Sequence, residues 1–144
     1  MNIGEVKYSV SEILDGLDPN VEHMEDGSMR VAVNSTAVYV SVDMQDVAQG
    51  DSRSVITITS PVLRNVELTD DLYKWIATMG WRYIFGHVTF EDATGFGEIN
   101  FQHHLLGDLL DAEELEAAVI GVVGTADELD DVLRGRFGGD RFVD

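Results

Sequence analysis

The chain has 144 residues, a formal net charge of −18 from 27 Asp and Glu against 9 Lys and Arg, and no cysteine. This length suits one domain, and we expect residues 1–144 to fold as a single unit. Without cysteine there is no disulfide framework and no thiolate metal site, which favours a reducing compartment. Because so acidic a chain repels phosphate groups, nucleic acids and anionic membranes are excluded as partners.

The first fourteen residues mix charged with apolar side chains, and no apolar run there is long enough for a signal peptide or a membrane span. We therefore expect a cytoplasmic protein. The acidic charge has three explanations: it keeps the protein soluble, it steers a basic segment of a partner, or it reflects adaptation to salt. Solubility is the most general of the three.

A first helix is predicted near the amino terminus. Apolar residues recur there at the spacing of one helix face, and the sequence Asp-Pro-Asn at residues 18–20 stops the run. The apolar residues of this face are Val6, Val10, Ile13, Leu14 and Leu17. Two start signals compete, Asn2 with Glu5 and Ser9 with Glu12, so the first residue of the helix stays open.

Two turns and a strand are predicted next. The pair Asp26-Gly27 lies between short apolar runs, which is the best local signal for a β-hairpin, and the chain turns again at residues 34–36. Apolar and polar side chains then alternate, which is the period of a strand with one buried face. The apolar members of this alternation are Val38, Val40 and Val42.

A polar loop is predicted for residues 46–52. Residues 53–60 are rich in β-branched side chains and predict another long strand, which Pro61 ends because proline cannot donate a ladder hydrogen bond. A short middle helix follows. It is capped by Thr69 and reaches Met79, just before a glycine.

The last third of the chain predicts two strands and one long helix. The strands cover residues 81–91 and 98–106, and a loop with two glycines joins them. Asp111 and Glu114 form a capping box, a pairing that marks the start of a helix. From there the helical pattern continues to Phe137.

This long helix is predicted to be amphipathic. Its apolar stripe consists of Leu115, Val119, Val122, Ala126, Leu129 and Leu133. Most of its carboxylates lie off that stripe. Gly121 and Gly124 each cost about 1 kcal/mol relative to alanine inside a helix, and Thr125 with Glu128 is a second start signal, so a bend near Gly124 stays open.

No catalytic or metal-binding group of residues is predicted. The imidazoles are His23, His87, His103 and His104, and a metal site needs several of them to converge. His103 and His104 are neighbours in a predicted strand, so they point to opposite faces and cannot bind one ion together. Carboxylates are abundant, but abundance without a pocket does not indicate acid–base chemistry. The sequence therefore predicts no catalytic residue, no metal and no cofactor.

Large apolar side chains gather on and after the middle helix. Core packing explains one face of that helix, yet Trp and Tyr lie on differing sides and offer more apolar surface than one sheet face needs. We therefore expect a homodimer or partner contact there. The residues of this predicted interface are Leu72, Tyr73, Trp75, Ile76, Met79 and Trp81.

The order of elements in this small, very acidic chain resembles the type III secretion chaperone fold, and more closely the YbjN-like domains of the actinobacterial type. The local matches are residues 9–16 before Asp26-Gly27, His104-Leu105-Leu106 before residues 112–115, residues 126–129 and residues 136–139. The resemblance implies a protein without a catalytic motif. It also implies dimerisation through the middle helix, here residues 69–79, and binding of extended segments of a client protein.

The sequence thus predicts an α+β fold, with an antiparallel sheet of five to six strands, an N-terminal helix, a short middle helix and a long C-terminal helix. The expected function is that of a non-catalytic chaperone-like or adaptor protein that binds a segment of an unidentified protein client. Two alternatives stay open. One is a small enzyme that uses acidic residues and histidine in a pocket, and the other is a regulatory stress-response dimer with no client.

Overall fold

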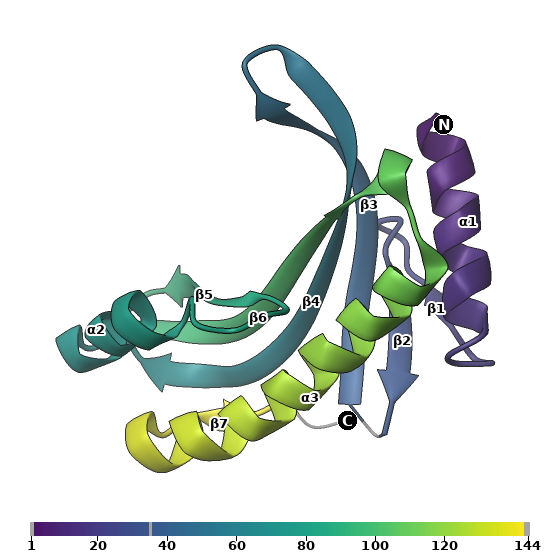
Figure 1. Ribbon diagram of the computed structural model, residues 1–144. Coiled ribbons are helices and arrows are strands. Elements are labelled where there is room, and N and C mark those ends of the chain that lie inside the picture. The colour runs from purple at the N-terminus through teal and green to yellow at the C-terminus, as the bar shows by residue number, and fades with distance from the viewer. Residues whose placement is uncertain (1, 35, 143–144) are drawn as a thin grey trace.

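The computed structural model describes residues 2–34 and 36–142. Ser35, the middle residue of the turn predicted at residues 34–36, lies outside the described residues. Within them the chain forms three α-helices, a short 3₁₀ helix and one antiparallel sheet of seven strands (Figure 1). The strand order is β1-β2-β3-β4-β6-β5, and β7 pairs with β4.

The elements in chain order are α1 (Ile3–Asp15), β1 (Glu22–His23), β2 (Met29–Val33), β3 (Thr36–Ala48), β4 (Asp51–Glu67), α2 (Asp70–Met79), β5 (His87–Ala93), β6 (Phe96–Leu106), η1 (Gly107–Leu109), α3 (Ala112–Phe137) and β7 (Asp140–Arg141). The predicted fold class and its three helices are confirmed. The hairpin predicted around Asp26-Gly27 is present as β1 and β2. The sheet has seven strands where five to six were expected, and β7, a pair of residues, is too short to show as a sequence pattern.

The start of α1 is decided by its cap. The side chain of Asn2 accepts a hydrogen bond of 2.9 Å from the backbone N–H of Glu5, which satisfies one of the free donors of the first turn. The face predicted from the spacing of apolar residues is the buried one, since Val6, Val10 and Leu14 have no exposed surface.

The hairpin between β3 and β4 is longer than the sequence predicts. In place of the loop expected for residues 46–52, β3 runs to Ala48 and β4 resumes at Asp51, so only a tight turn remains, with Gly50 at a φ of +73°. The polar side chains of this hairpin are exposed on both faces, which is compatible with an isolated strand pair in water. Figure 1 shows the hairpin projecting away from the helices and from the rest of the sheet.

Pro61 does not end its strand, contrary to the prediction. The ladder between β3 and β4 stops at the pair Tyr39–Thr59, so the missing N–H of Pro61 has no β3 carbonyl to leave unpaired. On its other side β4 continues beside β6, with Pro61 opposite Asn100, and the register shifts between Pro61 and Leu63 and again before Val66. The strand bends along this stretch, as Figure 1 shows.

The strand predicted for residues 81–91 begins only at His87. Residues 81–86 form an irregular segment, because the chain must turn back from α2 to the sheet edge. Gly86 makes that return with a φ of +113°, and a Cβ there would lie 2.5 Å from the carbonyl oxygen of Gln102. The loop expected between the last two strands is also shorter, a turn in which Thr94 and Gly95 both have positive φ.

The long helix α3 is continuous. Asp111 caps it by accepting a hydrogen bond of 3.0 Å from the N–H of Glu114, as the capping box predicts. Every residue of the predicted apolar stripe is buried. No second helix starts near Gly124, because intact helix runs through both internal glycines to Phe137.

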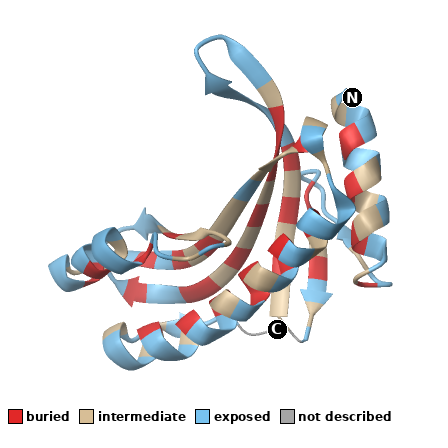
Figure 2. Cartoon of the chain, in the orientation of Figure 1, coloured by how far each residue is buried: buried red, intermediate tan, exposed pale blue. Residues whose placement is uncertain are grey.

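The helices pack on one face of the sheet. Burial alternates along the central strands, so that Val38, Val40 and Val42 of β3 face the core, as predicted, while the residues between them are partly exposed (Figure 2). Side chains from α1, α2, α3 and the sheet join one apolar core. None of the described helices covers the second face of the sheet.

Candidate functional site

The open face of the sheet is the first candidate surface. On β4, Ile56 and Ile58 are buried beneath the helices, whereas Thr57 and Thr59 alternate with them and point to the other face, where they are half-buried. β6 repeats the pattern, because Phe101 is buried and its neighbour Gln102 is half-buried. A face of this kind offers hydroxyl and amide groups to whatever lies on it.

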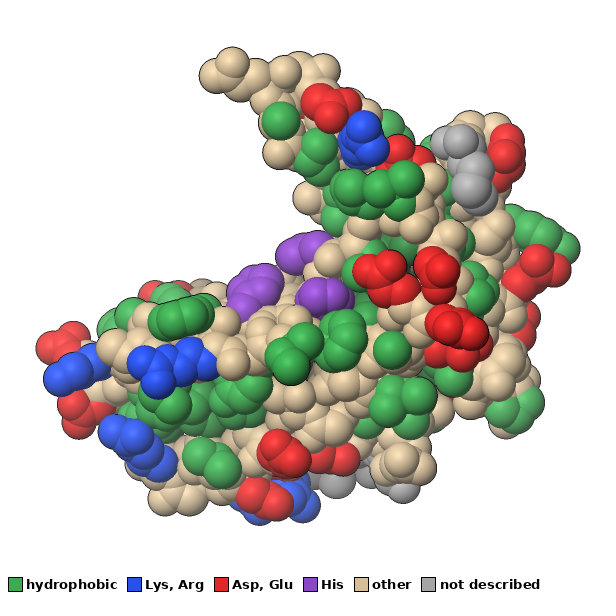
Figure 3. All heavy atoms as spheres, viewed as in Figure 1, with side chains coloured by type: hydrophobic (Ala, Val, Ile, Leu, Met, Phe, Trp, Pro, Cys, Tyr) green, Lys and Arg blue, Asp and Glu red, His purple; other side chains and the backbone are tan. Residues whose placement is uncertain are grey.

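This face is hollowed. Figure 3 shows a concave region between the β3–β4 hairpin and the end of the molecule that carries α2, with imidazoles on its floor. The rings of His87 and His104 lie 5.9 Å apart between centroids, and His104 Nδ1 lies 3.1 Å from Thr57 Oγ1. Gln102 Nε2 donates to Thr59 Oγ1 over 3.1 Å. The floor is therefore polar, and strands β4, β6 and β5 all contribute to it.

The two adjacent histidines point to opposite faces, as the strand geometry predicts. His103 lies on the helix-covered face and packs edge to face on Phe85, with ring centroids 5.5 Å apart. Burial lowers the pKa of both His103 and His104, and the positive charge that His87 gains on protonation lowers both further. Among residues 2–34 and 36–142, no three His, Asp or Glu side chains gather in a way that could hold a metal ion.

A second hollow, of about 660 Å³, lies at the other end of β3. Tyr39, Pro61 and Phe142 line it together with Asp130 of α3. Arg141 Nε reaches Asp130 Oδ2 over 2.6 Å, so the carboxylate already has a charged partner there. This hollow therefore has aromatic walls, and its other carboxylate, Asp127, accepts a hydrogen bond of 2.7 Å from the hydroxyl of Thr36.

The structure divides the six residues of the predicted interface. Leu72 and Trp75 belong to the core of the single chain, with 0% and 8% of their surface exposed, and Ile76 packs against that core from its edge. The exposed members are Tyr73, Met79 and Trp81. Only these three of the six are free to contact another molecule.

Sequence reasoning misses two exposed apolar residues near these three. Ile84 is 90% exposed in the irregular segment after α2, and Phe90 of β5 packs against Tyr73 with ring centroids 5.1 Å apart. Within the strand predicted for residues 81–91, Ile84 looks like any other apolar strand residue. We call Tyr73, Met79, Trp81, Ile84 and Phe90 together the α2 patch.

A family model described as T3SS (YopN, CesT) and YbjN peptide-binding chaperone 1 matches residues 5–144. The chain belongs to this family. The resemblance found in the sequence is confirmed, and with it the predicted non-catalytic, chaperone-like role. Since the family is described by peptide binding, the prediction that the chain is not an enzyme is also confirmed.

Several solved structures share this fold, and three of them are chains of two-protein complexes. A chain of the ExsC–ExsE complex superposes with a TM-score of 0.66 and 17% identity, over 91% of this chain and 95% of that one. A chain of the HopA1–SchA chaperone–effector complex superposes with a TM-score of 0.59 and 10% identity, over 91% of this chain and 98% of that one. The Yersinia pestis type III secretion chaperone SycH, solved with a fragment of YscM2, superposes with a TM-score of 0.54 and 12% identity, over 89% of this chain and 99% of that one.

At these identities the likeness shows the fold alone. A search of curated protein sequences found no match. None of the described helices is long and apolar enough to cross a membrane.

Proposed function

We propose that this protein holds an extended segment of a client protein on the open, concave face of its sheet, beneath the β3–β4 hairpin. The observation that carries the proposal is that the three helices leave this face uncovered while it presents half-buried Thr57, Thr59 and Gln102. Membership of a family of peptide-binding chaperones supports the same role. A static surface of hydrogen-bonding groups suits binding and requires no chemistry.

Free backbone beside this face supports an extended ligand. The ladder between β2 and β3 ends at the pair Met29–Val40, so among the described strands the rest of β3, to Ala48, has only β4 as a neighbour. An exposed strand edge pairs readily with an extended peptide, whose backbone supplies affinity while side-chain pockets supply specificity. The projecting hairpin therefore presents both an edge and a face to a client.

The proposal includes a homodimer formed through the α2 patch. Its residues combine large apolar surface with exposure, and Trp and Tyr are enriched where proteins associate. The guanidinium of Arg82 lies 5.5 Å from the centre of the Trp81 ring and covers only part of that ring. In this arrangement Leu72 and Trp75 pack in the core beneath the patch and do not contact the second copy.

We also propose a cytoplasmic location and one folding unit spanning residues 1–144. The single apolar core, which draws on all three helices and on the sheet, supports the second point. The regulatory dimer without a client stays the rival function. It predicts self-contact at the α2 patch and nothing on the open face.

Site-specific photocrosslinking in the native cell separates the two. A photoreactive phenylalanine replaces Thr59 on the open face, and a matched variant carries it at Ala117, an exposed residue of α3. We expect one discrete adduct with a second protein from position 59 and none from position 117. Equal adducts at both positions, or none from position 59, contradict client binding at this face. A photoreactive group in place of Trp81 should yield an adduct of two copies of the chain.

A further inference from the structure

A small apolar hollow lies at the foot of the β3–β4 hairpin. It has a volume of about 260 Å³ and is lined by Leu105 and Leu106 at the end of β6 and by Leu109 and Leu110 just beyond. Leu109 is 67% exposed, an unusual state for a leucine among three others. Because small-molecule pockets start at about 300 Å³, this hollow suits a single inserted side chain better than a ligand.

Carboxylates surround these leucines. Asp111 and Glu114, from the start of α3, line the hollow itself. Residues 43–51 of the hairpin contain three Asp, and residues 108–116 contain five Asp and Glu. The cation beside them is Arg53, which pairs with Asp108 at 3.0 Å and with Asp51 at 3.3 Å. Most of the negative charge at this end of the molecule therefore lacks a cationic partner within the described residues.

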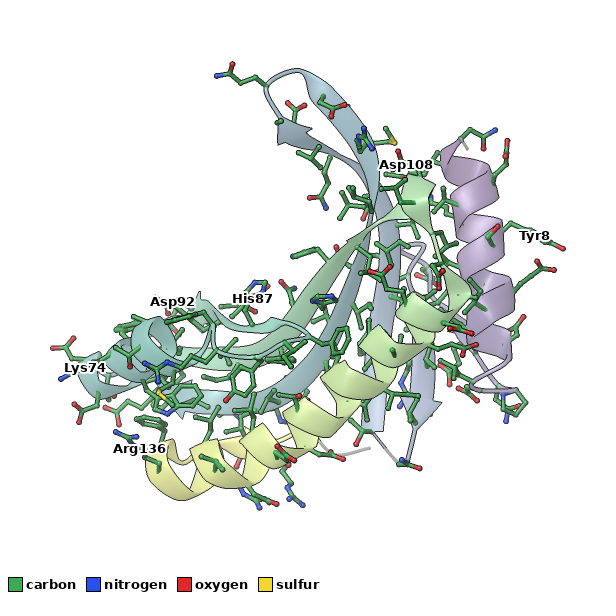
Figure 4. All side chains as sticks on the ribbon, viewed as in Figure 1. Tyr8, Lys74, His87, Asp92, Asp108 and Arg136 are labelled. Carbon is green, nitrogen blue, oxygen red and sulfur yellow. The ribbon has the colours of Figure 1, made fainter. Side chains whose placement is uncertain are left out.

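Most of the other Lys and Arg residues lie toward the α2 end of the molecule. Figure 4 places Lys74 and Arg136 at the α2 end and Asp108 at the foot of the hairpin. Figure 3 shows Lys and Arg atoms beside carboxylates over the α2 end, whereas carboxylates predominate below the hairpin. The net charge of −18 is thus spread unevenly, and the apolar hollow opens into its acidic part.

We propose that this leucine hollow receives an apolar side chain of the client segment, and that the surrounding carboxylates select segments with Lys or Arg beside that side chain. The inference rests on the proposed function and deepens it, because it names the chemistry of the segment. A second copy of this chain is a poor occupant, since it would bring the same carboxylates into contact with these. His104, which also lines the hollow, connects it to the floor of the concave face.

Purified protein is used to select from a phage library of random 15-residue peptides, and the winning peptides are synthesised. We expect them to carry an apolar residue flanked by Lys or Arg. Replacing the basic residues of one peptide by Glu should weaken its binding at least tenfold in fluorescence anisotropy at low salt. Because exposed charges are screened, that difference should shrink at 1 M salt.

Two matched pairs of variants locate the site. Leu109→Ser should weaken binding of the basic peptide at least tenfold. Val132→Ser on α3, a position that is 57% exposed, should leave binding unchanged. Glu114→Gln should weaken it a few-fold, and Glu25→Gln, at the exposed β1–β2 turn, should not. None of these positions is buried, so each variant keeps its fold.

The outcomes distinguish the inference from the function on which it rests. The inference is overturned if peptides bind without basic residues or bind the Leu109→Ser variant as tightly as the wild type. Either result leaves the proposed peptide binding itself standing. A library that yields no binder counts against the proposed function itself. A change of oligomeric mass in Leu109→Ser, seen by light scattering, shows instead that the hollow is a contact between copies of the chain.

Discussion

Gly121 of α3 lies directly against the ring of Phe85, since a Cβ on Gly121 would come within 2.9 Å of Phe85 Cδ2. The same ring packs on His103 from the sheet. The absent side chain thus lets the irregular segment after α2 enter the space between α3 and β6. Gly124, one turn further on, plays no such part, because a Cβ on Gly124 would meet no atom of the described residues within 4 Å.

Alanine substitutions at the two glycines should therefore differ in sign. Gly124→Ala should raise the free energy of unfolding by about 1 kcal/mol, the difference in helix propensity. Gly121→Ala gains the same propensity but must displace Phe85, and overpacking costs about 1–3 kcal/mol, so we expect a net loss. Urea denaturation of both variants measures this. Equal stabilisation by the two substitutions would show that the Phe85 ring moves aside at no cost in stability.

The two tryptophans should respond in opposite ways. Trp81 is 64% exposed, so Trp81→Glu should leave the core of the chain intact and convert the proposed dimer to a monomer in light scattering. Trp75 is buried and packs on Phe137 with ring centroids 6.5 Å apart, so Trp75→Ala should cost about 3–5 kcal/mol of stability. An unchanged mass for Trp81→Glu removes the α2 patch as the dimer contact.

Asp18 should make stability depend on pH. The backbone N–H groups of Ala32 and Asn20 each donate to its carboxylate over 2.9 Å and hold the pKa of Asp18 below its ordinary value. A lowered folded pKa contributes stability above the unfolded value of about 3.9, and this is lost as the pH falls through the folded pKa. Wild type should therefore exceed Asp18→Asn in melting temperature at pH 7, and the gap should close below pH about 4. A constant gap over this range contradicts the assignment.

The histidines give a spectroscopic test of the concave face. Burial lowers the pKa of His103 and of His104, and the charge of His87 acts on both in the same direction. Their imidazole NMR signals should therefore titrate below about 6.5, and His87→Gln should raise both pKa values. Because the unfolded chain binds these protons first, stability should fall as the pH drops below about 6.5. If His87→Gln leaves the titration midpoints of His103 and His104 unchanged, the charge of His87 does not act on them.

Local patterns in the sequence determined the helices, their caps and the register of the core. The caps at Thr69 and Asp111, the stripe of α3 and the alternation of valines on β3 appear in the structure as predicted. Each depends on residues within about one or two turns of each other, because helix and strand periodicity and capping are short-range effects.

Only the tertiary structure decided the features that depend on distant partners. Pro61 stays inside β4 because the β3–β4 ladder stops at the pair Tyr39–Thr59, so no β3 carbonyl needs its missing N–H. Gly121 leaves room for Phe85 of the irregular segment at residues 81–86. The leucine hollow likewise joins the end of β6, η1 and the start of α3, and the open face exists because the helices all pack on the other side. Exposure and concavity arise from how elements meet, and the sequence by itself does not contain that information in any local pattern.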